Sequence, residues 1–355
     1  MINSTISLKK DIKSMQLEEL EIDLNKHGQP KYKAKQIYKW LHKKGVYYFN
    51  DMSDISKDFR RFLNDKYYIS VANIENKFVS DYDGTVKYLF KFGDNDFVES
   101  VLMKYKHGYS VCISTQIGCK MGCAFCATGM CGFKRDLTPS EMLAQIQAAQ
   151  EDQNIRISNI VLMGMGEPLD NFENVLKFLK LVSSDSGMNI GMRHISLSTC
   201  GLVDKIYELA DKKLQLTLSV SLHAPNDYIR DKIMPVNKKY NVEELIRACR
   251  YYSKVTNRRI SFEYAMINGL NDSEVCAKEL SKKLHGLLCH VNLIPINPVN
   301  GSDCKKSDDN KIKQFIKILG QNKITATVRR TLGSDINASC GQLRYNREGI
   351  NSENS

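Results

Sequence analysis

From about residue 96 onward, short apolar segments alternate with amphipathic segments, and this alternation restricts the fold more than any other feature of the sequence. Short apolar runs predict buried strands, and apolar residues at every third or fourth position predict helices. We expect strands at Glu99–Tyr105, Ser110–Ser114, Asn159–Met163, His194–Ser198, Gln215–Ser221, Arg259–Met266, Val291–Ile294 and Thr325–Arg329. We expect helices near residues 138–150, 171–184, 201–210, 242–255, 273–284 and 308–320. Repeated strand–helix units favour an α/β fold with a parallel sheet, as a full or partial barrel, whose chemistry lies at the carboxyl ends of the strands.

The helix expected near residue 138 has a well-defined start signal. Thr138 is placed to cap it, Pro139 occupies the first helical position and Glu141 the third. This combination is typical of a capping box that begins with proline.

Residues 1–95 follow a different pattern and are expected to form a small accessory unit. Helical segments are expected around Leu17–Leu24, at residues 31–44 and after a capping Ser56, and short strands are expected within residues 67–92. The sequence Asp81-Tyr82-Asp83-Gly84 is typical of a hairpin turn. We therefore divide the chain into an N-terminal helical and β-hairpin domain (1–95), a core with a C-terminal loop (96–343) and a polar tail (344–355).

The composition is that of a globular chain with an excess of basic residues. Hydrophobic residues make up 42% of the 355 residues, and lysine plus arginine exceed the acidic residues by 11. No apolar run approaches the roughly 18 residues of a membrane helix, and the first residues lack the apolar region of a signal peptide. We expect a soluble, cytoplasmic protein without membrane attachment. The basic excess fits a polyanionic partner such as nucleic acid, although a general effect on solubility explains it equally well.

Cysteines are concentrated in one segment of the chain. Five of the 11 cysteines fall within residues 112–131, and Cys119, Cys123 and Cys126 follow the spacing C-x3-C-x2-C. Three thiolates on one loop can hold a [4Fe–4S] cluster and leave one iron open for a substrate or cofactor, because such a cube ordinarily takes four cysteines. The alternatives are a zinc site with Cys131 as the fourth ligand, or plain buried thiols.

The cysteine spacing, with Phe125 directly before the last cysteine, resembles the radical S-adenosylmethionine (SAM) superfamily. The surrounding sequence is similar to one family within it, the RlmN/Cfr RNA methyltransferases, through six further motifs. These motifs are VCISTQ at 111–116, GFKR at 132–135, MGMGEP at 163–168, SLST at 196–199, SLHAP at 221–225 and DINASCGQL at 335–343. The resemblance covers nearly the whole chain. It implies a partial TIM-like (βα) barrel of the radical SAM type, with an N-terminal accessory domain and a C-terminal catalytic loop.

The resemblance also implies a reaction. Members of the C2 branch methylate carbon 2 of adenosine in 23S rRNA (adenosine-2503 of the peptidyl-transferase centre) and in tRNA (adenosine-37). They use one [4Fe–4S] cluster, two SAM molecules per turnover and a one-electron reductant such as flavodoxin or ferredoxin, and we expect a monomer. One alternative is a Cfr-type enzyme that methylates C8 and confers antibiotic resistance. The other is a non-enzymatic RNA-binding protein with a structural metal, which would be colourless and contain zinc.

By resemblance, specific residues receive roles in this reaction. Cys119, Cys123 and Cys126 hold the cluster, and Cys340 carries a methyl group that passes to RNA as a methylene radical. Cys112 then releases the product by forming a disulfide with Cys340. The residues expected to contact SAM are Gly166, Glu167, Ser198, Ser221, Leu222, His223 and Asn297.

Glu99 matches the proposed catalytic base of the family. A buried carboxylate on an apolar strand destabilises the fold unless a positive charge or hydrogen bonds compensate it. Its presence there favours a functional role. The alternative is a surface glutamate on an edge strand. Taken alone, each of the two catalytic cysteines would more often be a small buried apolar residue.

The last sequence feature is a row of lysines in the segment 31–44. Lys35, Lys39 and Lys43 follow one helical face, and aromatic residues are interleaved with them. Lysines can neutralise phosphates, so we assign this row to the RNA backbone. For the aromatic side chains Tyr38 and Trp40 we expect a place in the core.

Overall fold

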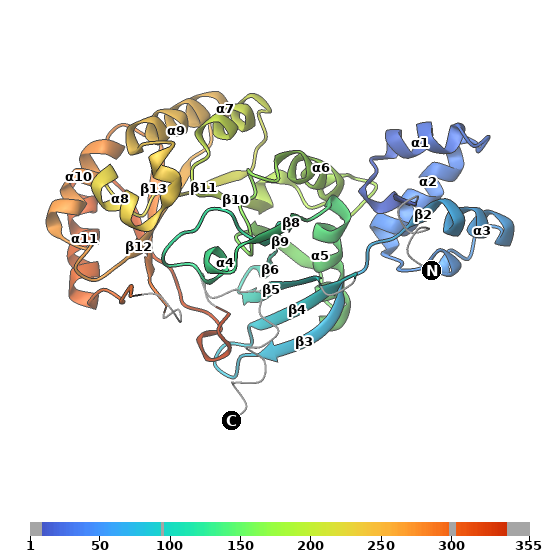
Figure 1. Ribbon diagram of the computed structural model, residues 1–355, viewed down its shortest axis with the longest axis horizontal. Helices are drawn as coiled ribbons and strands as arrows, with labels where there is room; N and C mark the ends of the chain where they lie inside the picture. The colour runs from blue at the N-terminus through green and yellow to red at the C-terminus, as the bar shows by residue number, and fades with distance from the viewer. Residues whose placement is uncertain (1–8, 94–95, 298–302, 339–355) are drawn as a thin grey trace.

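The computed structural model describes residues 9–93, 96–297 and 303–338, and its main feature is one curved sheet (Figure 1). The sheet has ten strands in the order β14-β13-β12-β11-β10-β9-β6-β5-β4-β3. Neighbouring strands from β6 to β14 run parallel, whereas β3 to β6 are antiparallel. In chain order, the strands are β3 (Asn73–Val79), β4 (Val86–Phe92), β5 (Asp96–Tyr105), β6 (Gly108–Cys112), β9 (Ile157–Leu162), β10 (Ile195–Thr199), β11 (Thr217–Ser221), β12 (Ile260–Met266), β13 (Cys289–Pro295) and β14 (Ala326–Val328).

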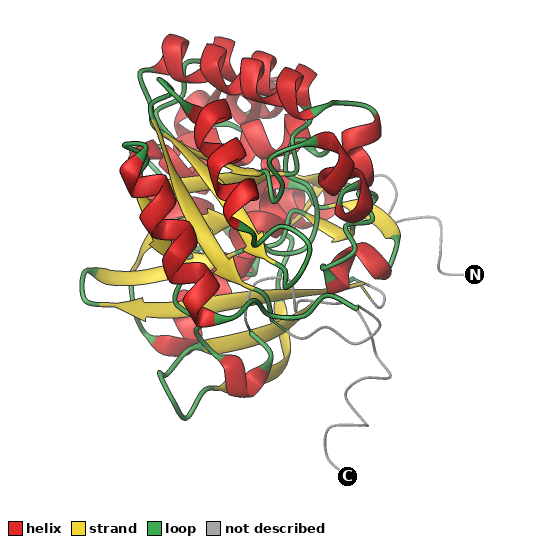
Figure 2. Cartoon of the chain, turned by 90° about the vertical axis from the view of Figure 1, so that its left-hand side faces the viewer, coloured by secondary structure: helices red, strands yellow, loops and turns green. Residues whose placement is uncertain are grey.

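Helices between the parallel strands cover the outside of the curved sheet (Figures 1 and 2). They are α5 (Pro139–Gln153), α6 (Phe172–Ser183), α7 (Val203–Asp211), α9 (Val242–Thr256), α10 (Glu274–Leu284) and α11 (Asp309–Gln321). Each strand and helix expected after residue 96 overlaps an observed one, so the predicted α/β fold is confirmed. The capping box of α5 is also present, because the Thr138 hydroxyl accepts from the Glu141 amide and the Glu141 carboxylate accepts from the Thr138 amide.

The N-terminal helices form a small module beside α5 (Figure 1). It contains α1 (Leu17–Asn25), α2 (Lys31–Lys39), a π-helical turn at Trp40–Lys44 and α3 (Lys57–Lys66). Strands β1 (Lys10–Asp11) and β2 (Tyr67–Tyr68) pair in parallel and close the module. Tyr38 and Trp40 are buried in its core, as expected. The module is docked by buried polar contacts as well as apolar ones, because the fully buried Lys13 donates a hydrogen bond to the side chain of Gln147 on α5.

The hairpin β3–β4 belongs to the main sheet rather than to the helical module with which the sequence grouped it. β4 pairs with β5 over seven residues, from Val86 opposite Leu102 to Phe92 opposite Asp96. β4 is mostly buried, so it needs a strand partner on each side and cover on its faces. The domain boundary expected at residue 95 therefore falls between β4 and β5, which pair in one sheet.

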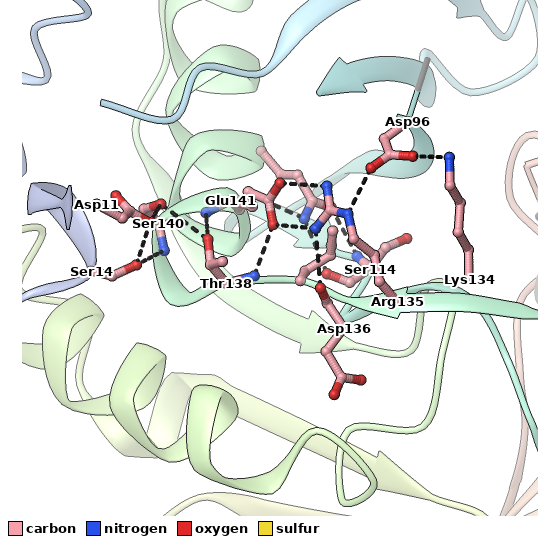
Figure 3. Close-up of polar contacts among 12 residues, drawn as sticks. Asp11, Ser14, Asp96, Ser114, Lys134, Arg135, Asp136, Thr138, Ser140 and Glu141 are labelled. Carbon is pink, nitrogen blue, oxygen red and sulfur yellow. Dashed lines mark hydrogen bonds and ion pairs between the residues drawn. The ribbon is translucent and has the colours of Figure 1, made fainter. Parts of the chain in front are cut away.

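A separate two-stranded sheet closes the loop that carries the three cysteines. β7 (Gln116–Gly118) pairs with β8 (Phe133–Asp136) and brings the two ends of the loop together. Arg135 of β8 holds this small sheet in place. Its guanidinium donates to Asp96 at 2.6 Å and to both carboxylate oxygens of Glu141 at 2.8 and 2.7 Å (Figure 3). The cysteine loop is thus tied to strand β5 and to the first turn of α5.

Ser140, next to this network, also tethers the N-terminal module (Figure 3). Its hydroxyl donates to the Asp11 carboxylate at 2.5 Å, and its amide donates to the Ser14 hydroxyl at 3.0 Å.

Among the residues that the structure describes, no helix is both long and apolar enough to span a membrane.

Candidate active site

A cavity of about 150 Å³ lies at the carboxyl ends of the parallel strands, where the fold predicts the chemistry. All three cysteines of the C-x3-C-x2-C motif line it. Five of the residues expected to contact SAM line the same cavity: Gly166, Glu167, Ser198, Ser221 and His223. Residues from the cysteine loop and from the ends of β9, β10 and β11 are therefore brought together, although they are spread over about a hundred residues of sequence.

The three cysteine side chains of the motif line the same cavity. Within the described residues, no three His, Cys, Asp or Glu side chains converge as ligands of a single metal ion. Three thiolates on one loop are the donor set of a [4Fe–4S] cluster with one open iron, so the chemistry of the side chains that line the cavity fits such a cluster. Burial raises the pKa of the Cys119 thiol to about 12 and that of Cys123 further, so binding of iron must displace protons.

Cys131, the candidate fourth zinc ligand, lies apart from this group. Its side chain is exposed, and its thiol contacts the carbonyl of Ala127 at 3.3 Å instead of lining the cavity.

Glu167 is buried at the edge of the cavity and is held by backbone amides. Its carboxylate accepts hydrogen bonds from the amides of Leu169 at 3.0 Å and Cys200 at 2.7 Å. Burial raises the pKa of Glu167, whereas these hydrogen bonds oppose the rise. The carboxylate is thus fixed between the loops that follow β9 and β10, where it can meet a positively charged ligand group.

The conformation of the loop before Glu167 requires glycine. Gly166 has φ +100°, and a Cβ there would lie 2.5 Å from the side chain of Gln116. A Cβ on Gly164 would lie 2.6 Å from the carbonyl oxygen of Ile113. These glycines let the loop pack directly against the segment that precedes the cysteines.

His223 is a neutral donor that lines the cavity. Its Nδ1 accepts a hydrogen bond from the Ala265 amide at 2.8 Å, which leaves the proton on Nε2. Burial, together with the charge of Arg230, lowers the pKa of His223 to about 3. The ring packs edge-on against Phe125, with 4.7 Å between the centroids, so Phe125 contributes an apolar wall to the cavity.

The other two expected SAM contacts lie elsewhere. Leu222 is fully buried beside the cavity, and its backbone amide donates to the carbonyl of Glu263 at 3.1 Å. Asn297 follows β13 and lines a second cavity of about 170 Å³.

The second cavity contains Cys112 and adjoins the first. Met163, Ile294 and Arg329 line both cavities, so the cavity of the three motif cysteines and the cavity of Cys112 share part of their walls. Cys112 is the last residue of β6 and is buried.

Glu99 is a buried carboxylate on β5. The ammonium group of Lys87, on the adjacent strand β4, lies 3.5 Å from its Oε1. Glu99 lies two residues before Val101, which lines the second cavity and pairs with Cys112, so the alternation of a strand places these side chains on one face. The glutamate is therefore not an exposed edge residue, and its pairing explains how the strand tolerates it.

Cys340 lies outside the described residues, but the segment that leads to it is anchored. The turn of the β3–β4 hairpin holds this segment: Ser80 donates to Asp335 at 2.7 Å, and the Gly333 amide donates to Asp83 at 3.0 Å. Ala338, two positions before Cys340 in the sequence, lines the second cavity together with Cys112.

Two site residues were not found from the sequence. Glu263, on β12, lines the first cavity, accepts from Asn292 at 2.8 Å and lies 3.8 Å from Arg329. The sequence contained a signal for Glu263, because this glutamate interrupts an apolar strand just as Glu99 does. The second is Arg230, on the short helix α8 (Asp227–Ile233), which is fully buried.

Comparisons with known proteins agree with this geometry. Residues 113–277 match the radical SAM superfamily, and residues 10–69 match the family described as "Ribosomal RNA large subunit methyltransferase N-terminal domain". A "Probable dual-specificity RNA methyltransferase RlmN" from Clostridium novyi (strain NT) is 52% identical over 337 residues, which cover 95% of this chain and 98% of the relative. The chain belongs to the RlmN family.

Two further comparisons agree with this assignment. A protein of the same name from Clostridium tetani (strain Massachusetts / E88) is 52% identical over 330 residues, 93% of this chain and 94% of the relative. The crystal structure of a radical SAM methyltransferase from Sphaerobacter thermophilus is 43% identical and superposes with a TM-score of 0.90, covering 94% of this chain and 99% of that one. The radical SAM fold and the family expected from the sequence are thus confirmed. RlmN-family proteins are RNA methyltransferases of the radical SAM type, a superfamily that uses a [4Fe–4S] cluster and SAM.

Proposed function

We propose that this protein methylates C2 of adenosine in 23S rRNA and tRNA, through a methyl group carried on Cys340. The observation that carries the proposal is the junction of two cavities, one lined by the three cluster cysteines and one by Cys112, which share Met163, Ile294 and Arg329. Radical generation and thiol chemistry therefore have adjoining sites. The name of the relatives gives RNA as the substrate class, and "dual-specificity" indicates two kinds of target. The name of the N-terminal family indicates large-subunit ribosomal RNA as one of them.

Cys119, Cys123 and Cys126 would hold the cluster at three of its irons. When bound, the cluster supplies the electron that cleaves SAM and produces a 5′-deoxyadenosyl radical. Around it, the fixed carboxylate of Glu167 is placed for the ammonium group of SAM, and the Ser198, Ser221 and His223 side chains offer polar groups at the strand ends. A one-electron donor of the flavodoxin or ferredoxin type completes this half of the reaction.

A thiol carrier is needed because C2 of adenine is neither nucleophilic nor acidic enough for direct methyl transfer from SAM. The Cys340 thiolate displaces the methyl group from one SAM, leaving S-adenosylhomocysteine. The radical from a second SAM removes a hydrogen atom from this methyl group, and the resulting methylene radical adds to C2. The adduct then loses the C2 proton and one electron, which the oxidised cluster would accept. Cys112 attacks the Cys340 sulfur, so that a disulfide forms and the carbon–sulfur bond breaks, and the released carbon takes up a proton to become the methyl group of the RNA. External thiols reduce the disulfide and reset the protein.

Glu99 is proposed to remove the C2 proton before release. It lies on the strand next to Cys112, and its pairing with Lys87 at 3.5 Å keeps a carboxylate in a buried position.

The product and the metal distinguish this function from its alternatives. Anaerobically purified protein is expected to be brown, to contain about four irons per chain and to yield 2-methyladenosine in digested RNA analysed by mass spectrometry. A yield of 8-methyladenosine would identify a Cfr-type enzyme. A colourless zinc protein that binds RNA without methylating it would contradict the proposal entirely.

RNA binding is assigned in part to Lys35, Lys39 and Lys43, which are all exposed on the N-terminal module. Reversing the three to glutamate is expected to raise the RNA KM about tenfold or more and to reduce the slope of log affinity against log salt by about 2 to 3, because each phosphate contact contributes a little under one unit. RNA-independent SAM cleavage should not change, since the cluster cysteines lie elsewhere. Filter binding at several salt concentrations measures both effects.

The matched control reverses three exposed lysines on the outer barrel helices, Lys282, Lys313 and Lys317. It makes the same change in net charge. If both triple variants weakened RNA binding equally, the effect would come from total charge, and the N-terminal row would not be a contact surface.

A further inference from the structure

Arg230 is a fully buried arginine that the proposed reaction does not use. Its guanidinium donates four hydrogen bonds: to the carbonyls of Leu222 (3.1 Å), Cys200 (2.6 Å) and Ser221 (3.1 Å), and to the Asn237 side-chain oxygen (3.0 Å). All four acceptors are neutral. The guanidinium thereby ties together the backbone at the carboxyl ends of β10 and β11.

The acidic side chains near Arg230 are linked to its guanidinium only through an intervening residue. Asp227 and Asp231 accept hydrogen bonds from the Asn237 amide at 3.0 and 2.7 Å, rather than from the arginine. Glu167 reaches the amide of Cys200, while Arg230 binds the carbonyl of that residue. A buried cation whose contacts are all neutral is costly unless another negative charge compensates it.

The compensating charge is expected on the side of the cysteine loop. Helix α8 packs behind this loop, because the Ile233 carbonyl accepts from the Ala124 amide at 3.0 Å and Met234 lines the first cavity. Cys200, the nearest acceptor of Arg230, lines that cavity together with Cys123. Arg230 therefore lies behind the part of the cavity wall that Cys200 and Cys123 share.

We propose that Arg230 is the buried counter-charge of the iron–sulfur cluster and a positioning residue that raises its reduction potential. This inference rests on the function proposed above. Three thiolate ligands make the cluster site anionic, and uptake of one electron adds a further negative charge. A cation buried nearby stabilises the reduced state more than the oxidised state, and the low dielectric constant of the interior strengthens the effect. Arg230 therefore lets a moderate one-electron donor reduce the cluster.

The test compares Arg230→Gln, which removes the charge but keeps an amide donor, with Arg230→Lys, which keeps the charge. The matched control is Arg258→Gln. Arg258 donates to the Leu216 carbonyl (3.4 Å) and the Thr217 hydroxyl (3.3 Å), at the opposite end of β11. Each holoprotein is reconstituted anaerobically, and its midpoint potential is measured by electron paramagnetic resonance during a redox titration.

Arg230→Gln is expected to shift the midpoint potential to more negative values, or to lose iron that the other variants retain, whereas Arg230→Lys and Arg258→Gln stay close to wild type. An unchanged potential in Arg230→Gln would overturn the proposal. So would loss of the native circular dichroism spectrum in iron-free Arg230→Gln, because the charge would then serve the fold without any cluster. If wild-type protein itself binds no iron, it is the proposed function that fails.

Discussion

Replacing Cys340 with alanine is expected to abolish RNA methylation, with a loss on the order of a thousandfold or more. The variant has no thiol to carry the methyl group, and direct transfer from SAM to C2 is chemically unfavourable. The three cluster cysteines and the first cavity are unaffected, so iron content and reductive cleavage of SAM should persist. Methylation is measured with methyl-labelled SAM, and cleavage by release of 5′-deoxyadenosine.

Cys276→Ala is the matched control for this experiment. Cys276 is a buried cysteine on α10, in contact with Ser273 at 3.2 Å and outside both cavities. It should methylate RNA like wild type. Full turnover by the Cys340 variant would show that the methyl group reaches RNA by a route without this thiol.

Replacing Cys112 with alanine is expected to give a different defect. The methylene radical can still form on Cys340 and add to adenine, but nothing attacks the Cys340 sulfur to release the product. A covalent adduct between protein and RNA should therefore accumulate, approaching one RNA per chain, while multiple turnover is lost. Denaturing gel electrophoresis with labelled RNA detects the adduct, and ribonuclease treatment should remove the shift.

Cys249→Ala serves as the control here, because Cys249 is fully buried on α9, away from both cavities. It should form no lasting adduct. Normal turnover without an adduct in Cys112→Ala would mean that another thiol resolves the intermediate. Together, the two catalytic cysteine variants separate loss of the methyl carrier from loss of the releasing thiol.

The sequence predicted the barrel well because its strands are short apolar runs and its helices are long enough for their periodicity to be visible. It did not predict α8 or the pairing of β7 with β8. Helix α8 has seven residues, too few for a clear period. The three residues of β7 pair with a strand on the far side of the cysteine loop, and no local pattern indicates such a contact.

The site was predicted unevenly for a similar reason. The family resemblance assigned the three motif cysteines, Glu167, Ser221 and His223 to one site. In the structure they line one cavity, because residues that follow successive strands meet at one end of a parallel sheet. Arg230 was missed because it begins the charged run Arg230-Asp231-Lys232, which is typical of an exposed face. In the structure, Arg230 lies three residues before Ile233 and shares the buried face of α8 with it and with Ile229.

The pairing of β4 with β5 makes the accessory and catalytic units inseparable in practice. A fragment that begins at residue 96 would expose the backbone donors and acceptors along β5, and such an open edge recruits other chains into aggregates. The same fragment would lack the hairpin turn that holds Asp335, and with it the anchor of the segment that carries Cys340. A minimal catalytic version of this enzyme would therefore have to start before β3.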